Sequence, residues 1–82
     1  MPTVHQAGGL GFVVFVNDHP PAHVHAIGVG GEAKIELGDA GPRLVWVRGL
    51  SRADTRFALS EVAREMQNLR AAWIRLHGDG DD

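Results

Sequence analysis

The sequence predicts an α+β fold, in which a four-stranded, mainly antiparallel sheet carries one long C-terminal helix packed on one face. Between residues 12 and 48, short runs of β-branched, aromatic and other apolar residues alternate with turn signals rich in glycine and proline. After residue 51 the apolar residues recur at alternating spacings of three and four, which is typical of one face of a helix. The 82 residues are enough for one domain and not for two. We assign this domain to residues 1–78.

The expected strands follow one another along the first 48 residues. Residues 1–11 are rich in glycine and lack a clear period, so we expect a loosely held arm there. The segments between the strands contain proline or glycine clusters that end a strand. The turn before the third strand, residues 28–31, has the glycine content of a hairpin. The four predicted strands cover residues 12–16, 23–27, 32–37 and 43–48.

The last third of the chain predicts one helix over residues 52–77. Ser51, with Asp54 three residues later, resembles a capping box at the start, and Gly78 gives the expected stop. The apolar stripe consists of Leu59, Val62, Met66, Leu69, Trp73 and Leu76. A straight helix of this length spans about 39 Å at 1.5 Å per residue, more than the diameter of a globule of this size. Either the helix bends, or its end projects and is covered by a second subunit.

The second and third strands predict where two histidines point. Side chains alternate between the two faces of a strand, and the apolar set must face the helix. The apolar set is Val24, Ala26, Ala33, Ile35 and Leu37. The opposite face then carries His23, His25, Ile27, Glu32, Lys34 and Glu36. With a hairpin loop of two or four residues, the two histidines lie opposite or diagonal to Glu36 and Lys34.

This region also contains the candidate functional site, Asp18, His19, His23 and His25. Pro20 and Pro21 stiffen the loop that leads to the histidine-bearing face. Three neutral imidazoles and a carboxylate suit a divalent transition metal such as zinc, and an open coordination position would permit hydrolysis. Two alternatives stay open: a structural polar cluster that orders the loop, and a metal-free binding or RNase-like site. The segment has no lysine or tyrosine to complete an RNase-like site, so the sequence leaves open whether the protein is an enzyme.

Composition limits the location and the partners. The chain has no cysteine, which excludes disulfides and thiolate metal ligands. It has neither an apolar run long enough for a membrane span nor the start of a signal peptide, so we expect a cytoplasmic protein without membrane contact. The net charge of −2 makes nucleic acid an unfavourable partner. Residues 79–82 contain three aspartates and are expected to form a disordered acidic tail.

A protein is a more favourable partner for this chain than nucleic acid. Arg52, Arg56 and Arg70 lie along one margin of the helical stripe and are candidate partner-binding residues, with an ordinary solvated helix edge as the alternative. The strands predicted at residues 12–16 and 43–48 contain apolar residues at successive positions, so both faces of the sheet need cover there, and one helix covers only one face. We therefore expect a homo-oligomer or a complex with a small protein partner.

Several segments also carry a family resemblance: Met1-Pro2-Thr3-Val4, Leu10-Gly11-Phe12, Asp18-His19, His23-Val24-His25-Ala26, Glu32-Ala33 and Trp73. In these segments the chain resembles the small bacterial proteins grouped as domain of unknown function 4160. It departs from the usual family pattern at residues 20–22, at Val24 and at Ile27. The resemblance implies a small α+β fold. It also implies a partner encoded by a neighbouring gene, in a pair of the toxin–antitoxin type.

Overall fold

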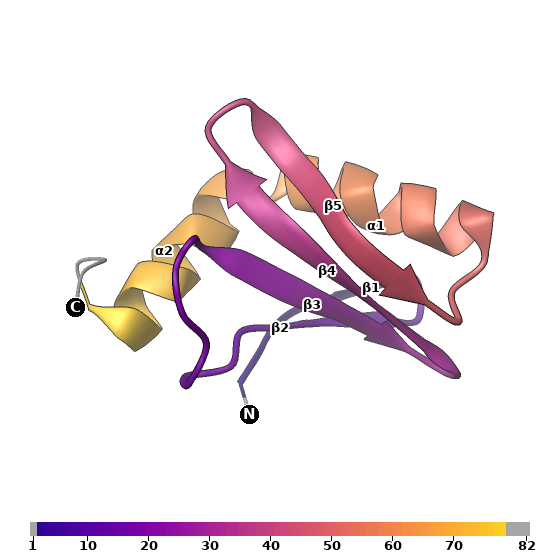
Figure 1. Ribbon diagram of the computed structural model, residues 1–82, viewed down its shortest axis with the longest axis horizontal. Coiled ribbons are helices and arrows are strands. Elements are labelled where there is room, and N and C mark those ends of the chain that lie inside the picture. The colour runs from indigo at the N-terminus through magenta and orange to yellow at the C-terminus, as the bar shows by residue number, and fades with distance from the viewer. Residues whose placement is uncertain (1, 79–82) are drawn as a thin grey trace.

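The computed structural model describes residues 2–78, which form five strands followed by two helices (Figure 1). The strands are β1 (Thr3–Ala7), β2 (Leu10–Val13), β3 (His23–Gly28), β4 (Gly31–Gly38) and β5 (Gly41–Arg48). The helices are α1 (Arg52–Arg64) and α2 (Met66–His77). The predicted α+β class with an antiparallel sheet is confirmed. The tail predicted for residues 79–82 lies outside the described residues.

The sheet is a meander in which each strand pairs antiparallel with the next one along the chain, in the order β1-β2-β3-β4-β5. The prediction of four strands was wrong, because the supposed arm of residues 1–11 forms β1 and begins β2. Gly8 and Gly9 make the turn between them with φ of 59° and 80°, which glycine adopts at no steric cost. The register shifts between Thr3 and His5, so β1 is a short and irregular edge strand without an apolar alternation.

The β3–β4 hairpin confirms the predicted arrangement of the two faces. A two-residue turn at 29–30 joins the strands, His23 pairs with Glu36, and His25 pairs with Lys34. The apolar residues of both strands face the helices and are buried. Both histidines therefore lie on the opposite face of the sheet, together with Glu32 and its polar neighbours on β4.

β5 accommodates a proline because it is an edge strand. A two-residue turn makes Gly38 and Gly41 a hydrogen-bonded pair, so Leu37 and Pro42 form the following pair without ladder hydrogen bonds. The ring nitrogen of Pro42 then faces the outer edge, where no amide hydrogen is required. A register shift in the middle of the strand leaves Val45 as an extra residue of β5, as in a β-bulge.

The single long helix predicted for residues 52–77 was wrong, because Glu65 separates two helices with φ −102° and ψ 19°. Glu65 joins the helices directly: its N–H donates to the Glu61 carbonyl at the end of α1, and its carbonyl accepts from the N–H of Leu69 at the start of α2. The apolar spacing is therefore preserved and does not reveal the break. The described domain measures 35 × 26 × 19 Å, so a straight helix of about 39 Å would have projected beyond it. At the start of α1, Ser51 Oγ accepts a hydrogen bond from the N–H of Asp54 at 3.0 Å, as the capping motif predicted.

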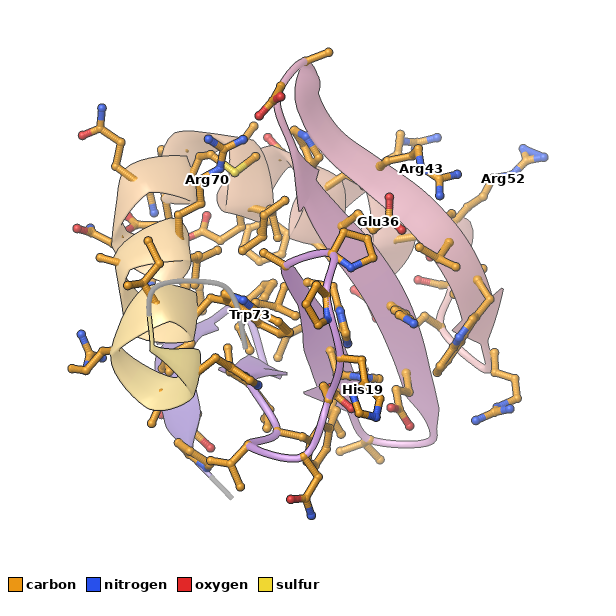
Figure 2. All side chains as sticks on the ribbon, turned by 60° about the vertical axis from the view of Figure 1, so that its left-hand side comes forward. His19, Glu36, Arg43, Arg52, Arg70 and Trp73 are labelled. Carbon is orange, nitrogen blue, oxygen red and sulfur yellow. The ribbon has the colours of Figure 1, made fainter. Side chains whose placement is uncertain are left out.

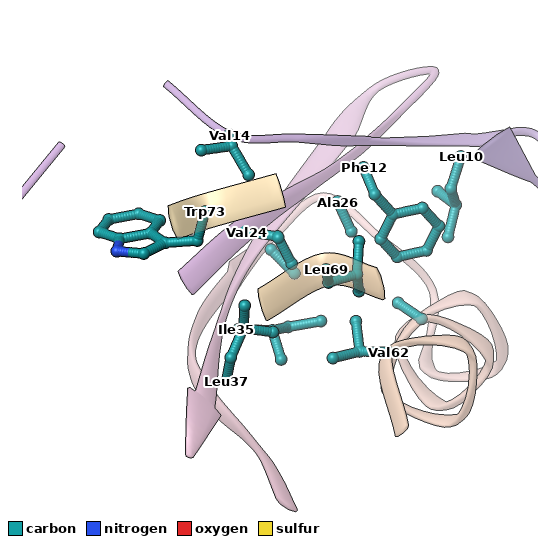
Figure 3. Close-up of a cluster of buried hydrophobic side chains, with 12 residues drawn as sticks. Leu10, Phe12, Val14, Val24, Ala26, Ile35, Leu37, Val62, Leu69 and Trp73 are labelled. Atoms are coloured by element: carbon teal, nitrogen blue, oxygen red, sulfur yellow. The ribbon is translucent and has the colours of Figure 1, made fainter. Parts of the chain in front are cut away.

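Both helices cover the same face of the sheet and bury an apolar core against it, which Figure 1 and Figure 3 show. The buried core residues are Leu10, Phe12, Val14, Val24, Ala26, Ala33, Ile35, Leu37, Ala58, Val62, Leu69 and Trp73. Trp73 is only 3% exposed, so its place on the buried stripe is confirmed. Neither α1 nor α2 is long and apolar enough to cross a membrane.

Candidate functional site

The loop between β2 and β3 holds Asp18 over the face of the sheet that the helices leave open. The loop turns back early, because the N–H of Asp18 donates to the carbonyl of Phe15 at 3.0 Å. At its end, the carbonyl of Ala22 accepts a hydrogen bond from the N–H of Leu37 on β4 at 2.9 Å. Between these anchors the Pro20–Pro21 peptide bond is cis. Backbone contacts thus fix both ends of the segment that approaches the histidines.

Asp18, His23 and His25 converge on one point. The Asp18 carboxylate oxygen Oδ2 lies 2.9 Å from Nε2 of His23 and 3.3 Å from Nε2 of His25. All three ligand atoms lie within 4.8 Å of one another. The two histidines stand two residues apart on β3, so their rings rise from the same face of the sheet. The structure therefore brings together three of the four residues of the predicted site.

The second ring nitrogen of each histidine, Nδ1, also has a hydrogen-bond partner. Nδ1 of His23 donates to the backbone carbonyl of Pro21 at 2.9 Å, and a carbonyl can only accept. Nδ1 of His25 lies 2.9 Å from the carboxylate oxygen Oε2 of Glu32. When Nδ1 carries the hydrogen, the neutral form of each ring directs an Nε2 lone pair toward the Asp18 carboxylate. Because these groups repel one another, a proton or a metal cation must lie among them.

Aromatic rings enclose this cluster. His23 is only 3% exposed, and its ring centroid lies 5.1 Å from that of Trp73 on α2. The ring centroid of His25 lies 5.9 Å from that of Trp46 on β5. The Asp18 side chain remains 27% exposed. Solvent or a ligand therefore reaches the cluster from the side of Asp18.

His19 does not join the cluster. It follows Asp18 in the loop, where Figure 2 labels it, and its side chain is exposed. The alternation that places His23 and His25 on one face does not extend into an irregular loop. Glu32 is the polar residue that the predicted site lacked, since it holds His25. Its place on the same face of the hairpin was the available signal.

The three candidate partner-binding arginines differ in their surroundings. Arg70 Nη2 donates to the backbone carbonyls of Leu37 and Gly38, at 3.1 and 2.6 Å, which ties α2 to the end of β4. Arg52 and Arg56 are exposed and form no salt bridge with any residue in the range 2–78. They are therefore the two members of the set that the fold leaves accessible.

A second cluster of titratable groups joins β1 to the break between the helices. His5 Nε2 lies 2.7 Å from the carboxylate of Glu61, Arg64 also donates to that carboxylate, and Arg64 Nη1 lies 3.2 Å from Glu65. The hydrogen bonds from His5 and Arg64 hold the pKa of Glu61 below its ordinary value, and the Glu61 carboxylate raises the pKa of Arg64. Because the Arg64 guanidinium already contacts both carboxylates, this cluster stabilises the fold and is a poor cation site. Sequence reasoning missed it because His5 lay in the supposed arm.

The fold and the site define a class of small α+β domain, in which a β-meander carries a His–His–Asp cluster on the face that its two helices leave open. The chain belongs to the family described as a domain of unknown function (DUF4160), whose family model matches residues 9–74. This match confirms the resemblance drawn from the sequence. No curated protein and no solved structure gives a significant match to the chain.

Proposed function

We propose that Asp18, His23 and His25 bind a divalent transition-metal ion, with zinc as the expected occupant. The observation that carries this proposal is the orientation of the two imidazoles. Their Nε2 atoms converge on one carboxylate oxygen, while Pro21 and Glu32 hold their Nδ1 atoms. Metal-binding histidines in proteins almost always donate their second ring N–H to a carbonyl or carboxylate in this way.

The distances among the three residues suit a first-row metal. Zinc–ligand bonds of about 2.0–2.2 Å in a tetrahedral arrangement separate neighbouring ligand atoms by about 3.3 Å. The Asp18 oxygen lies 2.9 and 3.3 Å from the two Nε2 atoms, within a few tenths of an ångström of that separation. Imidazole and carboxylate ligands without thiolate are compatible with zinc, nickel, copper or iron.

Three protein ligands favour a catalytic site over a structural one. Structural zinc sites are closed by four protein ligands, whereas catalytic sites keep a position for water or substrate. A metal held by these three residues would supply Lewis-acid chemistry for hydrolysis at neutral pH. The exposed side of Asp18 gives a substrate access to that position. Metal-assisted hydrolysis is therefore the activity to test first.

A metal-free, RNase-like site is the second candidate, and one observation favours it. Lys34 pairs with His25 across β3 and β4 and supplies the lysine that the loop segment lacks. His25 would then exchange protons with the substrate, and Lys34 would stabilise a phosphate charge. A chelator distinguishes the two candidate activities, because it abolishes metal-assisted hydrolysis and leaves a metal-free activity unchanged.

The metal proposal is tested on protein purified without a histidine tag. Its metal content is measured by elemental analysis, and its melting curve is then recorded with zinc, nickel and manganese ions. A metal present at a hundredfold excess over its Kd stabilises the folded state by about 2.7 kcal/mol. For a domain of this size that corresponds to a rise in Tm of about 16 °C.

Matched variants separate a metal site from a structural cluster. Asp18→Asn and His25→Ala should abolish the metal-induced rise in Tm, whereas His19→Ala, from the same loop, should retain it. His5 is unsuitable as the control because it bonds to Glu61. The proposal fails if none of the three ions shifts the melting curve, or if the shift persists in both cluster variants. The other outcome is that the parent protein does not respond to metal while the cluster variants still lower its Tm. That result would identify a structural cluster in which a proton, not a metal, lies between the groups.

A further inference from the structure

β5 presents a long free edge. It is the last strand of the meander, and within residues 2–78 no other strand lies along its outer side. The strand has eight residues, and Val45 and Val47 are 38% and 39% exposed. The opposite edge, β1, has only five residues; a register shift interrupts both edges, at Val45 in β5 and between Thr3 and His5 in β1. An exposed edge strand offers unpaired N–H and C=O groups to which another extended chain can bind.

Arginines line both sides of this edge. Arg43 and Arg48 lie on the face away from the helices, where the Arg43 side chain is 66% exposed and the Arg48 guanidinium lies 4.7 Å from the centre of the Trp46 ring. Arg52 and Arg56 stand one turn apart on α1, the helix that packs against β5. Figure 2 shows Arg43 and Arg52 projecting on the β5 side of the molecule. This edge is therefore locally positive, although the whole chain has a net charge of −2.

Acidic groups near the edge offset only part of that charge. Glu36 accepts a hydrogen bond from Arg43 at 3.0 Å, and Asp54 is exposed in the first turn of α1. Glu32, which His25 contacts, pairs with Arg48 across β4 and β5. The four arginines therefore exceed these three carboxylates by one positive charge.

A second copy of this chain would fit the edge poorly. If residues 43–48 paired over their full length across a two-fold axis, Arg43 would lie opposite Arg48 of the other copy. Like charges directly opposite each other destabilise a strand pair. Nucleic acid would match the arginines, but it would leave the backbone groups of β5 and the exposed side of Val47 without partners.

We propose that the outer edge of β5 binds an extended, acidic segment of a partner protein by strand addition. The backbone of that segment pairs with β5, and its carboxylates face Arg43 and Arg48 on one side. On the other side its apolar residues pack on Val47, with further carboxylates within reach of Arg52 and Arg56. The proposal does not depend on the metal site, although Trp46 lies between Arg48 and His25.

The test uses a fluorescein-labelled ten-residue peptide in which glutamate and valine alternate, with binding followed by fluorescence anisotropy. A second peptide of the same sequence carries N-methyl groups on consecutive backbone nitrogens, which blocks both of its edges, so that it keeps the side chains but cannot add to a sheet. We expect the first peptide to bind and the methylated one not to. Hydrogen exchange of the amides in residues 44–48 should slow when the first peptide is bound.

Charge-reversal variants locate the contact. Arg43→Glu and Arg52→Glu should each weaken binding by about tenfold. Arg75→Glu is the matched control, because Arg75 is exposed on α2, which packs against β1 and β4, and it should leave affinity within about twofold. Circular dichroism confirms that each variant is folded.

Five results would overturn the proposal. Equal binding of the methylated peptide would mean attraction by charge alone, and an equal effect of Arg75→Glu would mean the same. Tighter binding of a single-stranded RNA of equal charge would assign the arginines to nucleic acid. Self-association in sedimentation that Arg43→Glu abolishes would make the edge an interface between copies. A peptide that does not bind at millimolar concentration would refute strand addition directly.

Discussion

Replacing Trp73 by alanine tests how α2 is held on the sheet. The Trp73 side chain is 3% exposed, its ring stacks on His77 with centroids 3.8 Å apart, and it lies 5.1 Å from His23. Removing a buried aromatic side chain of this kind costs about 3–5 kcal/mol. A domain of this size has an unfolding entropy near 170 cal/mol/K, so each kcal/mol lowers Tm by about 6 °C. We therefore expect Trp73→Ala to melt about 17 to 29 °C below the parent protein.

The chain contains a matched control in its other tryptophan. Trp46 is half-buried on the opposite face of the sheet, where it contacts Arg48 and His25. Trp46→Ala removes the cation–π contact with Arg48 and the ring contact with His25. It should lower the free energy of unfolding by less than about 2 kcal/mol. Thermal unfolding followed by far-ultraviolet circular dichroism compares the two. The packing described for α2 is refuted if Trp73→Ala melts within a few degrees of the parent, or if Trp46→Ala is the more damaging change.

Two further predictions concern the fold. Because His5 and Arg64 lower the pKa of Glu61, the ionised carboxylate stabilises the fold above its ordinary pKa of 4.5, and this contribution is lost as the pH falls below that value. Glu61→Gln should flatten that part of the curve of Tm against pH, and an unchanged curve would contradict the assignment. Gly49→Ala should cost clearly more than Gly30→Ala in urea unfolding. The two glycines have φ of 78° and 82°, but a Cβ at position 49 would lie 2.1 Å from the carbonyl oxygen of Gly30, whereas one at position 30 meets nothing within 4 Å. Equal costs would mean that the close backbone approach is not a constraint.

The features that could be predicted from the sequence are those that a local pattern encodes. Val24 and Ala26 alternate with His23 and His25, and this alternation alone assigns the histidines to the open face. Trp73 continues a helical spacing, so its burial followed directly. In each case one residue's position determines the face of its neighbours, because strand and helix periods are fixed by geometry.

The errors arose where that local pattern is weak. Thr3, His5 and Gln6 give β1 a polar, irregular sequence that does not look like a strand, and only the turn at Gly8 and Gly9 marked a hairpin. The break at Glu65 leaves the apolar spacing intact, because a single residue joins the two helices. Neither proline nor glycine is present there to signal it.

The candidate site was predictable to the extent that it lies on β3. His19 was included on its proximity in sequence alone, and only the path of the loop decides that it points away from the cluster. The Pro21 carbonyl is a backbone group that no side-chain pattern reveals. The contact between His23 and Trp73 joins residues that are far apart in the chain, so it requires the complete fold.

The meander also has a consequence for the order in which the protein folds. Asp18, His23, His25 and Glu32 all belong to one continuous stretch of chain, and each strand pairs only with its neighbours in sequence. Closing these short loops costs little chain entropy, and topologies rich in local contacts fold quickly. We therefore expect the cluster to assemble with the β3–β4 hairpin, before α2 brings Trp73 onto His23. A metal ion that binds the cluster would then act on a folding intermediate as well as on the finished domain, and would favour formation of the sheet on which the helices later pack.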